Sequence, residues 1–233
     1  MNKSLMLIIL ISSVLFVQGC MLNEKSNPKE GSRMASLNQQ LFSAAEAKDT
    51  KSIEKLIQEG VDVQARDQSG RTALMIATYN RDTASVQKLI EAGADVNQQD
   101  DMLNSPFLYA GAEGYLDILK LTIQAGADPA IKNRYGGTAL IPASEHGYVD
   151  VVRELLTNTT VDVNHVNKLG WTALLEAIIL NDGNERQQKT IELLIHHGAD
   201  VNLADGDGVT PLRHARAKGF KEIEAILLQA GAK

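Results

Sequence analysis

Short apolar blocks recur at regular intervals along most of this chain and predict a series of amphipathic helices. The pattern is clear in Val86, Leu89 and Ile90, which are three and one positions apart. Four later blocks repeat it: Ile118, Leu119 and Ile123; Val151, Val152, Leu155 and Leu156; Ile191, Leu194 and Ile195; Ile223, Ile226 and Leu227. Residues at this spacing share one helix face, so each block needs a neighbouring surface to cover it.

A shorter alanine-rich segment that opens with Thr or Ser precedes each amphipathic block. The opening residues are Thr72, Ser105, Thr138, Thr172 and Thr210, at spacings of 33, 33, 34 and 38 residues. A hydroxyl at this point can accept an unpaired N–H at the start of a helix, so all five are predicted N-caps. Small residues on the helix that follows allow neighbouring units to approach closely.

Turn phrases separate these helix pairs. Four of the phrases end in glycine, which permits the positive φ of a hairpin tip. They are Asp67-Gln68-Ser69-Gly70, Asn133-Arg134-Tyr135-Gly136, Asn167-Lys168-Leu169-Gly170 and Asp205-Gly206-Asp207-Gly208. The third unit carries Leu103 where the glycine belongs. A second phrase, seen as Gly93-Ala94-Asp95-Val96-Asn97 and Gly198-Ala199-Asp200-Val201-Asn202, ends the units.

Together these phrases resemble the ankyrin repeat, a 33-residue unit of turn, helix, helix and loop. The resemblance covers residues 37–233 and implies an all-α solenoid of about six helix-turn-helix repeats with β-turn fingers. The repeats are expected at about 37–66, 67–99, 100–132, 133–166, 167–204 and 205–233. No unit can bury its apolar face alone, so the stack is expected to form one cooperative rod. The longer fifth unit places extra residues near 181–185, as an exposed turn or, less favoured, a clip for a partner.

The first 36 residues do not share the repeat pattern. Leu5 to Val17 is an apolar run of 13 residues, which is short for a bilayer span and typical of a signal-peptide core. It leads into Gly19-Cys20, which resembles the bacterial lipobox, whose cysteine is acylated. Residues 1–19 are therefore predicted to be a lipoprotein signal peptide, Cys20 the lipidation site, and residues 20–36 a flexible linker. The alternatives are an ordinary signal peptide and an uncleaved anchor.

Composition narrows the function classes. The net charge of −6 argues against a nucleic-acid-binding face, which requires a basic surface. Cys20 is the only cysteine, so no disulfide can form within the chain. The five histidines are scattered without metal-ligand spacing, and no glycine-rich phosphate loop precedes a helix. We expect a monomer without metal or cofactor that is not an enzyme. Met21 after the cysteine resembles the outer-membrane pattern, which favours the periplasmic face of that membrane.

The resemblance also implies where a partner protein would bind. Ankyrin stacks present a concave face made of turn tips and first-helix ends, positions that here include Tyr79, Met102, Asn104, Glu113 and Leu180. The richest stretch predicts seven partner-binding residues: Arg134, Tyr135, Glu145, His146, Lys168, Leu169 and Trp171. Tyr, Trp and Arg dominate binding hot spots. Trp171 is either a contact or local packing between fingers.

The leading hypothesis is thus a membrane-tethered protein–protein interaction module of the bacterial envelope, with an unidentified partner. A small-ligand or catalytic site in the groove of repeats four and five is a rival, in which Glu145, His146 and Glu176 would act together. No nucleophile or oxyanion donor accompanies them. A third hypothesis is a protective envelope role, since some exported bacterial ankyrin proteins are linked to oxidative-stress defence. Such a role would act through a partner, because the only thiol would be acylated.

Overall fold

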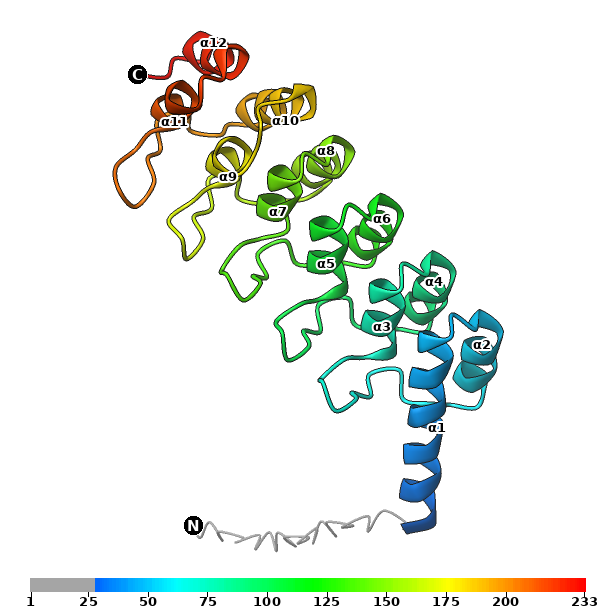
Figure 1. Cartoon of the computed structure of the whole chain (residues 1–233). Helices are drawn as coiled ribbons and strands as arrows, with labels where there is room; N and C mark the ends of the chain where they lie inside the picture. The colour runs from blue at the N-terminus through cyan, green and yellow to red at the C-terminus, as the bar shows by residue number, and fades with distance from the viewer. Residues whose placement is uncertain (1–27) are drawn as a thin grey trace, which may run out of the picture.

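The computed structural model describes residues 28–233, which fold into six stacked helix pairs joined by long hairpin fingers (Figure 1). The helices are α1 (Pro28–Glu46), α2 (Thr50–Gln58), α3 (Ala73–Tyr79), α4 (Thr83–Glu91), α5 (Pro106–Ala112), α6 (Leu116–Gln124), α7 (Leu140–Glu145), α8 (Val149–Asn158), α9 (Ala173–Ile179), α10 (Glu185–His196), α11 (Pro211–Lys218) and α12 (Lys221–Gln229). The expected all-α solenoid is confirmed.

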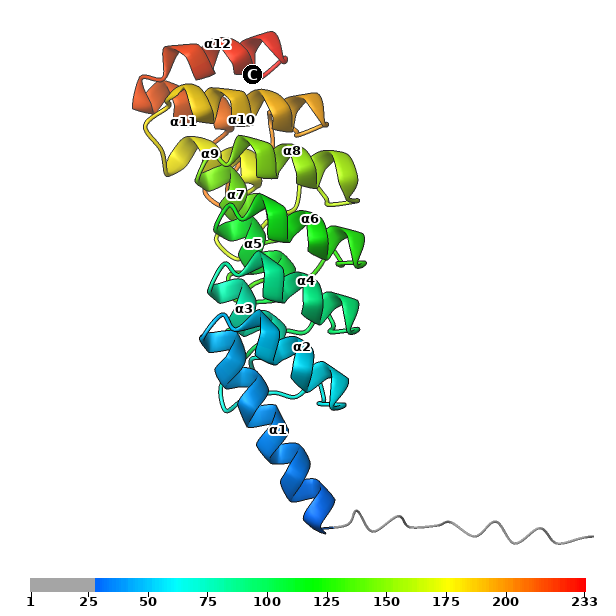
Figure 2. The same cartoon turned by 90° about the vertical axis from the view of Figure 1, so that its right-hand side faces the viewer.

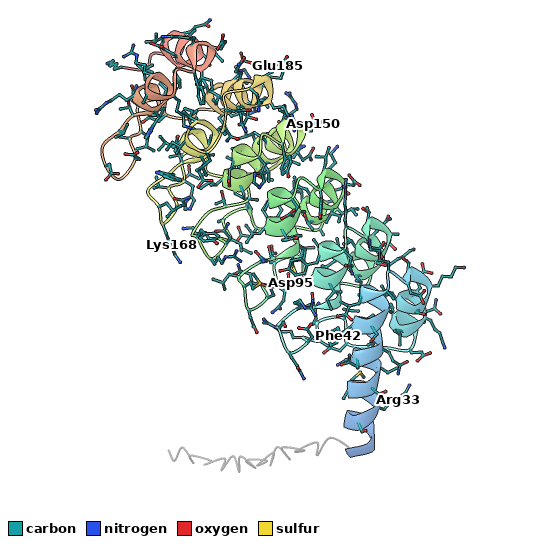
Figure 3. All side chains as sticks on the ribbon, viewed as in Figure 1. Arg33, Phe42, Asp95, Asp150, Lys168 and Glu185 are labelled. Carbon is teal, nitrogen blue, oxygen red and sulfur yellow. The ribbon has the colours of Figure 1, made fainter. Side chains whose placement is uncertain are left out.

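The helices form two layers that run the length of the stack (Figures 1 and 2). The odd-numbered helices pack on one another beside the fingers, and the even-numbered helices form the outer layer. Lys168 lies on the finger side, whereas Asp150 and Glu185 lie on the outer helices (Figure 3). One continuous apolar core extends from Leu37 to Ala232. Each repeat therefore buries its apolar face against its neighbours, as the sequence pattern predicts.

Four of the five predicted N-caps are confirmed. Their hydroxyl oxygens accept the backbone N–H three residues later at 3.2–3.4 Å, and they belong to Thr72, Ser105, Thr172 and Thr210. The prediction for Thr138 is wrong: α7 begins at Leu140, and the Thr138 hydroxyl is buried without a hydrogen-bond partner. Pro142 has no N–H to donate to the Thr138 carbonyl, so the Ile141 N–H bonds to it at 3.3 Å instead.

Each finger is organised by one Asp or Asn side chain at its start. Its Oδ1 atom accepts two backbone N–H groups, two and four residues later, at 2.8–3.1 Å. The five residues are Asp67, Asp100, Asn133, Asn167 and Asp205. Such side chains close turns without help from the rest of the fold, so the fingers are preorganised.

Leu103 holds the finger position that glycine occupies in the other repeats, at a positive φ of 59°. This conformation costs a non-glycine residue about 1–2 kcal/mol, which a glycine would avoid. A glycine also makes the unfolded chain more flexible, and that effect lowers the free energy of unfolding by about 0.4–1 kcal/mol. We expect Leu103→Gly to raise the free energy of unfolding by about 0.5–1 kcal/mol in urea titrations. The control is Leu228→Gly, a similarly exposed leucine within α12, which should lower it. A lowered midpoint for Leu103→Gly would contradict the strain.

A ladder of amide side chains ties consecutive repeats together behind the fingers. Asn97 donates from Nδ2 to the Gly126 carbonyl at 3.2 Å and accepts the Asp128 N–H at 2.8 Å. Equivalent bridges are made by Gln64, Asn164 and Asn202. Ala130 occupies this position in the third repeat, so the junction between repeats three and four lacks the bridge.

The N-terminal part of the fold differs from the expected linker. Helix α1 starts at Pro28, so the prediction of a flexible segment is wrong for residues 28–36. Proline suits the first helical position and Glu30 suits the positive end of the helix dipole, which favours helix where composition alone suggested a spacer. The predicted signal peptide, residues 1–19, and the predicted lipidation site Cys20 lie outside the described residues. Within residues 28–233, no helix combines the length and apolar character needed to span a bilayer.

The five extra residues of the fifth repeat are ordered. Two lengthen the connection between α9 and α10, and three lengthen α10, which has 12 residues where α4 has 9. Asn184 caps α10 by accepting two backbone N–H groups. Asn181 donates from Nδ2 to the Glu145 carbonyl of the preceding repeat at 2.7 Å. The insertion is therefore a longer hydrogen-bonded turn after α9 together with almost one extra turn of α10.

Candidate functional site

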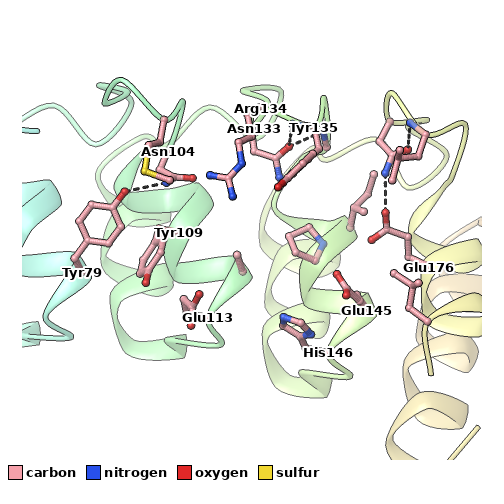
Figure 4. Close-up of a pocket in the computed structure, with 18 residues that line it drawn as sticks. Tyr79, Asn104, Tyr109, Glu113, Asn133, Arg134, Tyr135, Glu145, His146 and Glu176 are labelled. Atoms are coloured by element: carbon pink, nitrogen blue, oxygen red, sulfur yellow. Dashed lines mark hydrogen bonds between the residues drawn. The ribbon is translucent and has the colours of Figure 1, made fainter. Parts of the chain in front are cut away.

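A groove of about 580 Å³ runs along the stack between the fingers and the first helices of repeats two to five (Figure 4). The fingers of the third, fourth and fifth repeats form its upper wall. Helices α3, α5, α7 and α9 supply the floor and the lower wall. Because both sides repeat with the stack, side chains at equivalent positions form rows along the groove.

One such row is apolar and lies on the finger side. Met102, Tyr135 and Leu169 occupy the same position of three consecutive fingers and are 54%, 53% and 58% exposed. Leu180, at the end of α9, adds a further exposed apolar side chain to the lining. Polar residues take the equivalent position in the first and last fingers, so the row ends where the groove ends. Exposed apolar side chains gathered on a rigid surface are typical of a binding site.

A tyrosine cluster forms the end of the groove nearest the N-terminus. The Tyr79 hydroxyl donates to Asp100 Oδ2 at 2.5 Å and accepts from Asn104 Nδ2 at 2.9 Å. The rings of Tyr79 and Tyr109 meet edge to face, with centroids 4.4 Å apart. Burial and the hydrogen bond to Asp100 raise the pKa of the Tyr79 hydroxyl, so it stays protonated. These contacts hold two aromatic faces in place between repeats two and three.

Glu176 is the buried acid of the groove. It lies on α9, is 5% exposed, and its Oε1 accepts a hydrogen bond from Asn167 Nδ2 at 2.7 Å. Burial and the neighbouring charge of Glu145 raise its pKa to about 7, against the effect of the Asn167 bond. In the last repeat, His214 holds the equivalent position and contacts Asp205 Oδ2 at 2.7 Å. In the last repeat, the acidic residue of this pair is Asp205 on the finger. In the fifth repeat, it is Glu176 on the helix, and the finger carries Asn167.

Five of the seven predicted partner-binding residues line the groove: Arg134, Tyr135, Glu145, His146 and Leu169. The Arg134 guanidinium stacks on the Tyr135 ring at 4.8 Å from its centroid. Lys168 does not line the groove; its Nζ donates to the Arg134 carbonyl of the neighbouring finger at 3.0 Å. Trp171 is also absent from the lining and is half-buried. Of the three residues predicted in the fifth finger, the groove thus includes Leu169 but neither Lys168 nor Trp171.

Six lining residues were not among the contact positions expected from the sequence: Tyr109, Ala112, Asn133, Ile141, Pro142 and Asn167. Tyr109 and Pro142 lie four residues after the opening hydroxyl of their repeats, the same position as Glu176. Counting from the opening residue of each repeat would have placed Tyr109 and Pro142 in one row with Glu176. Within the described residues, no group of His, Cys, Asp and Glu is arranged to hold a metal ion.

Comparisons with known proteins agree with this architecture. A family model described as ankyrin repeats (3 copies) matches residues 20–100, 41–133 and 107–205. An ankyrin repeat domain from Acinetobacter baumannii AYE is 54% identical, with a TM-score of 0.81, over 83% of this chain and 98% of that one. The ankyrin repeat protein EF0377 is 40% identical, with a TM-score of 0.80, over 82% and 98%.

A curated relative matches over a shorter stretch. The ankyrin repeat protein YahD of Escherichia coli (strain K12) is 53% identical over 81 residues, which are 35% of this chain and 40% of YahD. The match therefore spans less than half the length of that relative. Ankyrin repeats are in general non-enzymatic modules for protein–protein interaction. The repeating sequence phrases, the stacked helix pairs and the matching family model together show that this chain belongs to the ankyrin repeat family.

Proposed function

We propose that this chain is a protein-binding module tethered to a bacterial envelope membrane by lipid on Cys20, and that it holds its partner in the groove of repeats two to five. The observation that carries the proposal is the apolar row of Met102, Tyr135 and Leu169. These side chains are exposed on fingers that their own hydrogen bonds preorganise. A partner would bind with little ordering cost on this side of the interface.

The groove is tested by cross-linking in intact envelopes, followed by capture of the chain and identification of what is bound. We expect Tyr135→Ser with Leu169→Ser to reduce partner recovery at least tenfold, because two exposed apolar anchors are removed. The control is Leu228→Ser, an exposed leucine on α12 outside the groove. Equal recovery from the groove variant and the control would contradict the assignment. Trp171→Ala separates the two roles of that residue. If Trp171 contacts the partner, the variant should recover less partner; if it only packs locally, the variant should be less stable but recover the partner normally.

The tether is tested by Cys20→Ala. The thiol is the atom that would carry lipid, so the variant should lose all incorporation of a clickable fatty acid and remain unprocessed. Two or more acyl chains anchor a protein stably to a membrane. Without them, the variant would keep only its uncleaved N-terminal segment as a means of membrane attachment. Labelling, the change in mass and the response to a lipoprotein signal peptidase inhibitor are measured together. Unchanged labelling and processing would contradict lipidation. Fractionation of the native chain tests the proposed location at the periplasmic face of the outer membrane.

A small-ligand site is the second candidate, because Glu145, His146 and Glu176 all line the same groove. The pKa of Glu176 near 7 would let it exchange a proton at neutral pH. Thermal shift of the purified chain against a library of small molecules tests this candidate. A shift that disappears in Glu145→Gln would favour it over a protein partner. The identity of a captured partner would likewise test a protective role in oxidative stress.

A further inference from the structure

A buried carboxyl group beside a neutral amide lies at the fifth-repeat end of the groove. Glu176 is 5% exposed, and within residues 28–233 its carboxyl group accepts one hydrogen bond, from Asn167 Nδ2. The sixth repeat exchanges the two positions: the carboxylate is Asp205, which accepts two backbone N–H groups and contacts His214 Nε2 at 2.7 Å. Of these two acids, the one that lines the groove therefore has the fewer hydrogen bonds.

No cation pairs with Glu176 within the described residues, although α7, α10 and α11 all pack against α9. Helix α7 places Glu145 and His146 in the same groove, and the negative charge of Glu145 opposes ionisation of Glu176. On the fingers, the guanidinium of Arg134 lies over an aromatic ring and Lys168 Nζ donates to a backbone carbonyl. The charged and titratable side chains of α10 and α11 are exposed or bound elsewhere: Glu185, Arg186, Lys189, Glu192, His196, Arg213, His214, Arg216 and Lys218.

Exposed apolar side chains lie next to this acid in the groove. Leu180 follows Glu176 by four residues, so the two side chains share one face at the end of α9. Leu169 lies on the finger whose Asn167 binds Glu176, and Pro142 comes from α7. Figure 4 shows the Glu176 carboxyl group on the groove side of α9. An apolar side chain seated between Leu169 and Leu180 would therefore cover the carboxyl group.

Covering Glu176 acts differently on its two protonation states. A neutral carboxyl group loses little when water is removed, whereas a carboxylate loses its hydration and gains no opposing charge. Burial and Glu145 already raise the pKa of Glu176 to about 7 in the free chain, and an apolar cover raises it further. The occupant therefore binds the protonated groove more tightly, and its affinity decreases as the pH rises above that value.

We propose, as a regulation that rests on the proposed function, that the groove binds an uncharged apolar segment of its partner together with one proton on Glu176. The proton comes from solvent and is held on Oε2, while Oε1 keeps the hydrogen bond from Asn167. The partner is held at mildly acidic pH and released at mildly alkaline pH. A lysine or arginine in the same place would have the opposite pH dependence, because a cation favours the carboxylate.

A tethered apolar probe tests the coupling without the partner. The full chain carries Cys20→Ala and Leu180→Cys, and the introduced thiol is labelled with acrylodan, an uncharged naphthalene dye whose emission shifts to the blue in apolar surroundings. We expect blue emission at pH 6, because the dye covers protonated Glu176, and a shift to the red as the pH rises to 8.5. The same dye on Leu228→Cys, outside the groove, should show no such shift. Emission at Leu180→Cys that does not change with pH would overturn the proposal.

Two groove variants assign the proton. Glu176→Gln cannot ionise and should abolish the shift with pH, whereas His146→Gln, which removes the imidazole of the same groove, should retain it. Glu145→Gln should move the midpoint of the shift to lower pH, because a neighbouring negative charge is removed. A shift that persists in Glu176→Gln, or that disappears in His146→Gln, would overturn the assignment. Circular dichroism at each pH verifies that the labelled chains remain folded.

The same coupling should appear in partner recovery from envelopes. Cross-linking at pH 6.5 should capture about ten times more partner than at pH 8.5, and Glu176→Gln should remove this difference. The proposed function fails separately. If Tyr135→Ser with Leu169→Ser loses the partner but recovery by the native chain does not depend on pH, only the regulation is wrong. If the dye titrates with Glu176 but those two substitutions do not reduce recovery, the proton coupling stands and the proposed function is wrong.

Discussion

Glu176→Gln should stabilise the chain at pH 8 and remove much of the pH dependence of its stability between pH 5 and 8. The pKa of Glu176 is raised to about 7 by burial and by Glu145, above the 4.5 expected for the unfolded chain. The folded state therefore holds the proton more tightly, and ionisation from pH 4.5 to 7 lowers the free energy of unfolding. The full difference is about 3 kcal/mol, or about 6–10 °C in melting temperature.

Glutamine keeps the Oε1 acceptor that Asn167 uses and cannot ionise, so the variant removes the titration at this site. The difference between native chain and variant should be near zero at pH 4.5 and should grow until about pH 8. Glu185→Gln is the control, because Lys189 lowers the pKa of that exposed carboxyl and its removal should not stabilise the chain at high pH. Parallel stability curves for the native chain and Glu176→Gln would contradict the assignment of a buried, late-titrating acid.

Phe107→Ala should lower the free energy of unfolding of the whole stack by about 3–5 kcal/mol. Phe107 is 1% exposed and lies on α5, in the third of six repeats, with packed repeats on both sides. A cavity there weakens two interfaces in the middle of a one-dimensional array, so the loss is shared by the cooperative unit. Urea unfolding followed by circular dichroism measures the shift in midpoint.

The matched variant is Leu227→Ala, which opens a cavity at an equally buried site on α12 in the last repeat. The terminal repeat has one neighbour only, so its loss should be local. Hydrogen exchange should then increase in residues 205–233 while the protection of α5 to α8 stays at the native level. If the two variants expose the same segments, the stack does not behave as a linear array of coupled repeats.

The fold could be predicted because its determinants are local and recur. The opening hydroxyls, the finger Asp or Asn and the apolar spacing each act within one repeat, and five or six copies reinforce one another. The failures occur where a single residue departs from the repeated pattern. Pro142 removes a donor and with it the cap at Thr138, and Pro28 with Glu30 starts a helix in a segment whose composition suggests a spacer.

The candidate site was predicted less completely, because a groove depends on which repeats lie side by side. Arg134, Tyr135 and Leu169 follow from their place in the fingers, and the structure places them in the lining. Trp171 ranked highly for its residue type, yet the groove does not include it. The raised pKa of Glu176 needs its depth and the approach of Glu145 from another repeat, which no single-repeat pattern contains.

Because Ala130 makes no amide bridge, we expect the junction between repeats three and four to bend more readily than the other junctions. Repeats three and four are joined by helix packing and by the Lys120–Glu154 ion pair at 3.8 Å, without the amide link that Asn97 and Asn164 provide on either side. The groove crosses this junction, with Met102 before it and Tyr135 after it. Bending at this junction would therefore change the distance between the two fingers. A bound partner that contacts both fingers would restrict that bending.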